Sequence, residues 1–168
     1  FGGLRPAAAV VVATIRALKM NGGRAKDELT TEDVDAVRRG FANLQAHVEN
    51  VRKFGVPPVV ALNRFTSDTE AEIEVVLEGC RAMGATAVVA DPWGGGGEGC
   101  LELADAVQDV IDGGEADYRP LYPTEGSLVS KIEAVATEIY GADGVDVVPA
   151  AAKQIARLEE IGLRDVPV

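Results

Sequence analysis

Aromatic residues, cysteine and histidine are all scarce in this sequence of 168 residues. Only 5% of the residues are aromatic, and there are two cysteines and one histidine. A structural zinc site needs four protein ligands, so Cys80, Cys100 and His47 do not predict a metal site. Two cysteines among apolar neighbours predict free thiols in a reducing compartment rather than a disulfide. His47 falls in the middle of a helical pattern, which favours a structural role over acid–base chemistry.

Positive charge and long apolar runs are also lacking. The sequence has 16 Lys and Arg against 27 Asp and Glu, a formal net charge of −11. Nucleic-acid surfaces need clustered basic residues, so we expect no nucleic-acid partner. No apolar run reaches the length of about 18 residues that spans a bilayer, and no signal peptide is recognisable. We therefore expect a cytoplasmic protein without a membrane partner.

Short aliphatic runs are what the sequence does contain, and each is followed by polar residues and a helical pattern. The runs are residues 7–13, 59–62 and 85–90. Continuous apolar runs of this length are typical of strands buried on both faces of a parallel sheet. Strands that alternate with helices form right-handed crossovers between neighbouring strands. The sequence therefore predicts an α/β fold built on a parallel βαβαβ sheet unit.

Helix boundaries can be assigned from capping residues. We expect a helix from Thr30 or Thr31 to about Phe54, and another that begins with Ser67 as cap and Glu70 three residues later. Residues 17–26 are expected to form a loop. Lys19, Arg24 and Lys26 surround the Gly22–Gly23 pair there, which favours a turn over an anion site.

The character of the chain changes after residue 112. A linker-like run at 113–117 precedes an extended segment and two helical patterns, from about Ser127 to Tyr140 and from Pro149 onward. We therefore expect two parts, an α/β part at 1–112 and a mostly helical segment at 113–168 that begins a following domain. The sequence has no initiator methionine, and we interpret it as an internal piece of a longer protein.

The polar ends of the three strands are expected at one edge of the sheet, where open α/β sheets bind ligands. Phe65 follows the second strand, and Trp93 follows the third beside five glycines within six residues. Glycine leaves room for a flat ligand, and two facing aromatic rings hold a planar heterocycle by stacking. Nearby polar residues are candidates for anion or nucleotide contacts, with surface solvation as the alternative: Arg16, Lys19, Asn63 and Arg64.

Several long strings closely resemble formate–tetrahydrofolate ligase, also called 10-formyltetrahydrofolate synthetase. They are VVVATIRALKMNGG at 10–23, FANLQAHVENVRKFGVP at 41–57, VVALNRFTSDTEAE at 59–72 and ATEIYGADGV at 136–145. The resemblance covers essentially the whole chain. It implies a P-loop-NTPase-like sheet and a C–N bond-forming, ATP-dependent ligase, in which formate and Mg-ATP give formyl phosphate and N10 of tetrahydrofolate takes the formyl group.

The resemblance also assigns roles to residues. It implies that Phe65 and Trp93 sandwich the pterin ring, with Thr66, Gly94, Gly95 and Gly96 beside them. It further implies that tetrahydrofolate, formate and ATP with Mg²⁺ are the small-molecule substrates and cofactors, with a monovalent cation as a further candidate, and that the enzyme of one-carbon metabolism is a homotetramer.

This sequence departs from the family pattern at two places. Thr66 stands where the family has Pro, and Gly94–Gly95 stands where it has Ala-Lys. The second departure removes the positive charge of that Lys, so we expect weaker folate binding. The family's G-x-x-x-x-G-K-[ST]-like phosphate loop does not occur in these 168 residues. We therefore expect the chain to supply the folate wall and to be inactive alone.

Two other interpretations remain open from the residues themselves. The chain could be a nucleotide-binding, P-loop-NTPase-like fragment in which the end of the second strand reads a base. It could also be a non-catalytic assembly domain whose helical tail mediates oligomer contacts. Substitution of Phe65 or Trp93 in the full-length protein distinguishes both from a folate site.

Overall fold

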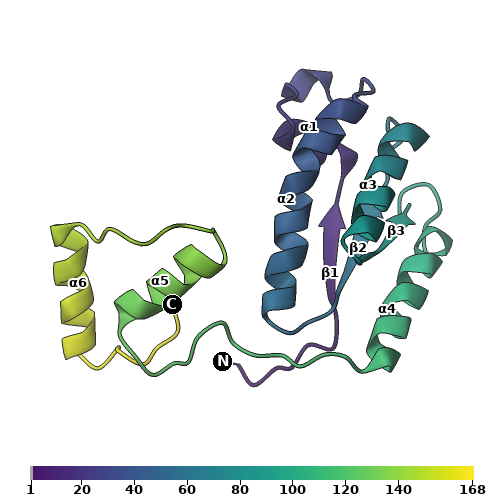
Figure 1. Ribbon diagram of the computed structural model, residues 1–168. Coiled ribbons are helices and arrows are strands. Elements are labelled where there is room, and N and C mark those ends of the chain that lie inside the picture. The colour runs from purple at the N-terminus through teal and green to yellow at the C-terminus, as the bar shows by residue number, and fades with distance from the viewer. Residues whose placement is uncertain (1) are drawn as a thin grey trace. The chain divides into compact units, whose positions relative to one another are not determined.

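The computed structural model describes residues 2–168, which form two compact units. One unit is Arg5–Tyr118, and the other is residues 119–168 together with residues 2–4. The elements are labelled in Figure 1. In the first unit they are β1 (Ala9–Ala13), α1 (Ile15–Asn21), η1 (Lys26–Glu28), α2 (Val34–Lys53), β2 (Pro58–Asn63), α3 (Glu70–Ala82), β3 (Thr86–Ala90), η2 (Glu98–Cys100) and α4 (Leu101–Gly113). The second contains α5 (Leu128–Glu138) and α6 (Pro149–Glu160).

The sheet of the first unit has three parallel strands in the order β1-β2-β3. Val11 pairs with Val60, and Leu62 pairs with Val89. The predicted α/β class and the parallel βαβαβ arrangement are therefore confirmed. The P-loop-NTPase-like assignment and the division of the chain at residue 112 stay predictions.

The central strand is buried on both faces because helices pack on each side of it. Val60 and Leu62 belong to the core beneath α2 and α3, which lie side by side in Figure 1. Side chains alternate along a strand, so Val59 and Ala61 face the other side, where α4 packs against β2 and β3. Both are buried as well.

β1 differs from the expectation of a strand buried on both faces. Val10 is 44% exposed and Val12 is 65% exposed, whereas Ala13 is buried. Val11 packs against the core under α2. The apolar run predicted a strand correctly, but its composition did not reveal that only one face of β1 is covered in this chain.

Three helix starts differ from the predicted ones. Residues 15–21 form α1, although residues 17–26 were expected as a loop, and the Thr14 side chain accepts a hydrogen bond from the Ala17 N–H. Asp33, and neither Thr30 nor Thr31, caps α2. The capping box of α3 is formed by Thr69 and Glu72 rather than Ser67 and Glu70. The pattern at 67–70 repeats two residues later, and a turn formed by residues 65–68 moves the start of the helix to the second copy.

Helix packing explains Gly22, the first of the paired glycines after α1, and Gly40 of α2, whereas Gly23 has a positive φ of +92°. A Cβ at Gly22 would lie 1.9 Å from the Ala36 carbonyl oxygen, and one at Gly40 would lie 1.9 Å from the Leu18 carbonyl oxygen. Glycine therefore lets the backbones of α1 and α2 touch. The turn interpretation of this segment accounts for the glycines without an anion, and Arg24 there lies near acidic partners, Glu28 and Asp33.

The second unit is held together by contacts with its own C-terminal segment. Ser127 caps α5, and the Leu128 N–H donates to Glu159 of α6. Lys131 is 1% exposed, and its ammonium group donates to the carbonyl oxygens of Arg164 and Val166. In the part of the chain that is described, no helix is long and apolar enough to cross a membrane.

Candidate functional site

The ends of β2 and β3 border one pocket of about 750 Å³ in the first unit. Parallel strands bring their carboxyl ends to the same edge of a sheet, which is where ligands bind in this class of fold. The pocket is mostly apolar with a few polar groups, as small-molecule sites are. Its lining residues are Asn63, Arg64, Phe65, Thr66, Asp91, Pro92, Trp93 and Gly94.

The two aromatic residues of the pocket are held very differently. Phe65 is half-buried, and its N–H donates to Asp68 Oδ2 at 2.9 Å. The neighbouring Arg64 N–H donates to the Ala90 carbonyl oxygen at 2.9 Å, so the backbone before Phe65 continues the pairing with β3. Trp93, in contrast, is 90% exposed. An indole left in water beside an apolar pocket indicates a surface for a ligand or partner.

The glycine-rich segment after β3 folds back on Asp91. Asp91 Oδ1 accepts a hydrogen bond from the Gly94 N–H at 2.7 Å, and the Asp91 N–H donates to the Gly99 carbonyl oxygen at 3.0 Å. A Cβ at Gly99 would lie 2.2 Å from the Asp91 carbonyl oxygen, and one at Gly95 would lie 2.8 Å from the Gly99 Cα. Loop closure therefore explains these glycines, where the sequence suggested that they clear room for a ligand.

The remaining predicted site residues fall into two groups. Thr66 and Gly94 line the pocket, and so do Asn63 and Arg64. Gly95 and Gly96 lie in the loop that follows Trp93, and they are not among the residues described as lining the pocket. Arg64 Nη2 lies 2.6 Å from Glu70 Oε1, but both side chains are well exposed. An exposed pair of this kind contributes little to stability, so Arg64 is accessible to an anionic ligand.

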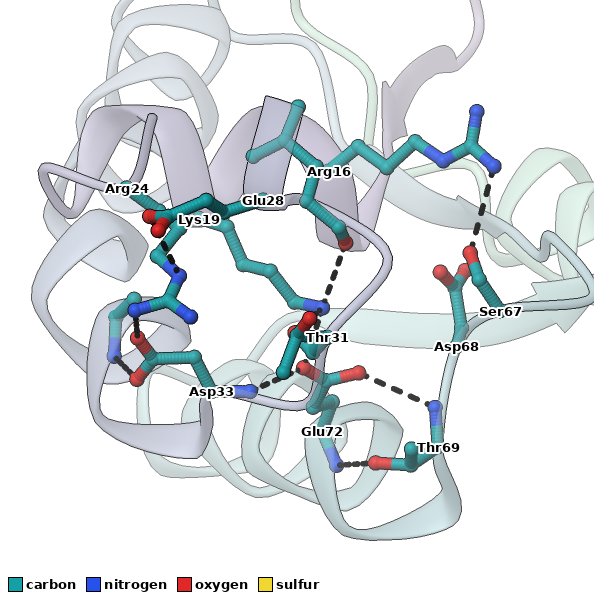
Figure 2. A network of polar contacts seen from close by, with 12 residues as sticks. Arg16, Lys19, Arg24, Glu28, Thr31, Asp33, Ser67, Asp68, Thr69 and Glu72 are labelled. Carbon is teal, nitrogen blue, oxygen red and sulfur yellow. Dashed lines mark hydrogen bonds and ion pairs between the residues drawn. The ribbon is translucent and has the colours of Figure 1, made fainter. Parts of the chain in front are cut away.

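Lys19 is enclosed by the protein, which differs from its expected role as an anion contact. Figure 2 shows its side chain reaching toward Glu72, and Nζ lies 2.6 Å from Glu72 Oε1. Both side chains are 0% exposed. Nζ also donates to the carbonyl oxygens of Leu29 and Thr31, each at 2.9 Å. An ammonium group has three N–H donors, so these contacts use all of them and leave none for a ligand.

Glu72 is the centre of this polar network, and sequence reasoning missed it. Its Oε1 accepts the Asp33 N–H at 2.8 Å, and its Oε2 accepts the Thr69 N–H at 3.2 Å. Burial acts to raise the pKa of Glu72, but the hydrogen bonds from Lys19, Asp33 and Thr69 outweigh it and hold the pKa below its ordinary value of 4.5. Glu72 therefore stays ionised and joins α1, the start of α2 and the start of α3.

Asp68 lies between this network and the pocket. It is 7% exposed, its Oδ2 holds the Phe65 N–H, and its Oδ1 has no hydrogen-bond partner among the described residues. Burial raises the pKa of Asp68, an effect opposed by the Phe65 hydrogen bond and by the charges of Lys19 and Arg16. The carboxylate thus fixes the backbone of Phe65 at an electrostatic cost.

The described residues contain no group of three or more His, Cys, Asp and Glu that could hold a metal ion. Cys80 and Cys100 are both free. Burial raises the pKa of Cys80 to about 11, which makes it an unreactive thiol. His47 is exposed on α2. None of these three residues is among those that line the pocket.

Comparison with known proteins identifies the family. The family model of formate–tetrahydrofolate ligase matches residues 1–168. The chain is 48% identical over 166 residues to the formate–tetrahydrofolate ligase of Granulibacter bethesdensis and 52% identical over 167 residues to that of Maricaulis maris. The chain belongs to the formate–tetrahydrofolate ligase family. Each alignment covers 99% of this chain but only 29% and 30% of the two relatives.

The chain spans about 30% of the length of these curated relatives.

Proposed function

We propose that this chain is part of an ATP-dependent ligase that joins formate to tetrahydrofolate, giving 10-formyltetrahydrofolate through formyl phosphate. Its own contribution is the wall that binds the pterin ring. The observation that carries this proposal is that Phe65 and Trp93, far apart in the sequence, line one apolar pocket at the carboxyl edge of the sheet. Membership of the ligase family supports the choice of tetrahydrofolate as the flat ligand.

The pocket suits a pterin because its lining is mostly apolar and includes a few polar groups. Phe65 supplies a ring whose backbone is fixed by Asp68. Trp93 supplies a second ring that is free to close over the ligand, since 90% of its surface is exposed. Asn63 offers an amide for the heteroatom edge, and Arg64 offers a cation for an anionic group such as a folate carboxylate. Stacking on each ring contributes about 1 kcal/mol beyond area burial.

The phosphate half of the reaction belongs to residues outside these 168. The sequence contains no G-x-x-x-x-G-K-[ST] loop, and the described residues offer no cluster of metal ligands for Mg²⁺. We therefore assign no contact with the ATP phosphates or with Mg²⁺ to this chain. The 168-residue chain is expected to form no 10-formyltetrahydrofolate by itself, and steady product formation by it would refute this.

The resemblance implies a homotetramer, and we propose this assembly and a cytoplasmic location for the whole ligase. Light scattering of the full-length enzyme measures the oligomeric state. This part of the proposal is independent of the folate pocket.

The test of the pocket is substitution of each ring in the full-length ligase. Phe65→Ala and Trp93→Ala are each expected to raise the KM for tetrahydrofolate about tenfold, because each removes one stacking face. The KM for ATP is expected to stay within twofold. Tyr140→Ala is the matched control, since Tyr140 is also an exposed aromatic residue, at 81%, and does not line the pocket. Unchanged KM values in both ring variants would overturn the folate site.

A nucleotide-base site is the second candidate, because Asn63 also lines the pocket. A strand-end Asn can read a purine base by paired hydrogen bonds. In that case the ring variants would raise the KM for ATP and leave the KM for tetrahydrofolate unchanged. The same measurements therefore separate the two candidates.

A further inference from the structure

Arg16 lies against the ring of Phe65. Its guanidinium carbon is 4.4 Å from the ring centroid, the geometry of a cation–π contact. Arg16 comes from the start of α1, directly after the end of β1. The residues that line the pocket, as far as the chain is described, include Phe65 but not Arg16. The guanidinium therefore contacts the Phe65 ring without being one of the residues that line the pocket.

Hydrogen bonding does not account for the position of this arginine. Figure 2 shows the side chain reaching Ser67, but Nη2 lies 3.4 Å from Ser67 Oγ, which is long for a hydrogen bond. Arg16 Nε is buried and has no hydrogen-bond partner among the described residues. The close, well-formed contact of the guanidinium is the one with the Phe65 ring. Asp68, whose charge interacts favourably with that of Arg16, accepts the Phe65 N–H.

We propose that Arg16 is a positioning and specificity residue of the folate site, which orients the Phe65 ring and makes it selective for the reduced over the oxidised pterin. This inference rests on the proposed function of the pocket. Orientation follows because the ring is fixed between Arg16 on one face and the Asp68 anchor on its backbone. A ring that is already placed loses less conformational freedom when a ligand binds.

Selectivity follows from the charge. The faces of a phenyl ring carry negative potential, and a cation on one face draws this electron density toward itself. The opposite face, which meets the ligand, becomes less negative. Such a face stacks better on an electron-rich ring. Tetrahydropterin has amine nitrogens that donate electrons into its pyrimidinone ring, whereas the fully oxidised pteridine of folic acid is electron-poor. The guanidinium behind Phe65 therefore favours tetrahydrofolate.

The experiment measures dissociation constants of both ligands in the full-length ligase under anaerobic conditions. Arg16→Met removes the charge and keeps a long side chain, and we expect it to weaken tetrahydrofolate binding about fivefold, the loss of one cation–π contact. Folic acid binding should change less than about twofold on the same scale, and kcat at saturating substrate should be unchanged. Arg16→Lys keeps the charge and should restore most of the preference for the reduced ligand. Arg16→Gln serves in place of Arg16→Met if that variant does not fold.

Arg39→Met is the matched control. Arg39 lies on α2, donates to the Gly22 carbonyl oxygen and does not contact Phe65. The inference is overturned if Arg16→Met weakens both ligands equally or neither, or if Arg39→Met gives the same loss of preference. Phe65→Ala distinguishes failure of the proposed role of Arg16 from failure of the proposed folate site. If Phe65→Ala leaves tetrahydrofolate binding unchanged, the proposed folate site is wrong. If it weakens binding while Arg16→Met does not, only the role of Arg16 is wrong.

Discussion

The Lys19–Glu72 cluster and the Phe65–Trp93 pocket differ in how far their side chains are exposed to solvent. At the Lys19–Glu72 cluster, both charged groups are 0% exposed and every donor of Lys19 has a partner. At the Phe65–Trp93 pocket, a large indole is left in water. Buried polar groups with all partners in place rigidify a structure, whereas an exposed apolar ring indicates a place for another molecule. The comparison teaches that Lys19 has a structural role, whereas the two rings remain available to a ligand, as proposed above.

The largest expected effect comes from removing one member of the buried pair. Lys19→Met leaves the Glu72 carboxylate buried without its counter-ion, and we expect it to lower the free energy of unfolding by about 3–5 kcal/mol. Urea unfolding followed by circular dichroism measures it.

Lys26→Met is the control for this loss, because Lys26 is exposed in η1. The double variant Lys19→Met with Glu72→Gln should recover part of the stability, since no buried charge remains. A loss below about 1 kcal/mol in Lys19→Met, the range of an exposed pair, would show that the cluster is not the rigid region described here.

A smaller loss is expected from adding one methyl group to the loop beneath Trp93. Gly99→Ala places a Cβ within 2.2 Å of the Asp91 carbonyl oxygen, which forces the loop to shift at a cost of about 1–3 kcal/mol. The KM for tetrahydrofolate should rise with it.

Gly97→Ala is the matched control for the loop, because Gly97 has an ordinary φ of −65° and nothing within 4 Å of a Cβ. Equal effects of the two substitutions would mean that loop closure on Asp91 does not shape the pocket. The same geometry predicts that Gly95→Lys, which would restore a family cation, strains the loop rather than improving folate affinity.

Acidity should weaken the buried Lys19–Glu72 cluster. The pKa of Glu72 is lower in the folded protein than its ordinary value of 4.5. The ionised Glu72 therefore stabilises the fold fully above pH 4.5, and this stabilisation is lost as the pH falls through the pKa of the folded protein. One proton taken up on unfolding changes the free energy of unfolding by at most about 1.4 kcal/mol per pH unit. Urea unfolding between pH 7 and pH 3 measures this slope, and Glu72→Gln should flatten it. An equal slope in both proteins would assign the effect to other carboxylates.

The smallest effect on stability is expected at Trp93. Because the indole is 90% exposed, Trp93→Ala should change the free energy of unfolding by less than about 0.5 kcal/mol while tetrahydrofolate affinity falls. Thermal unfolding of the variant, beside its KM, checks both. A clear loss of stability would mean that the indole packs against the protein and that its exposure is not a sign of ligand binding.

Much of the first unit was predictable because its signals are local. Aliphatic runs marked the three strands, and strand–helix alternation required parallel neighbours, so the convergence of Phe65 and Trp93 followed from chain direction alone. Helix starts were less predictable, because Ser67 and Thr69 offer the same capping pattern two residues apart. The choice between them depends on the turn in which Asp68 accepts the Phe65 N–H. The composition of the segment does not reveal this hydrogen bond.

The sequence by itself determined the order of the strands, the family of the chain and the placement of an aromatic residue after each of two strands, since each depends on residues that are neighbours along the chain. Only the tertiary structure decided that Lys19 is buried and that Arg16 contacts the ring of Phe65. These outcomes depend on partners that are distant in sequence, as Glu72 is from Lys19. Such contacts form only when the helices pack on the sheet.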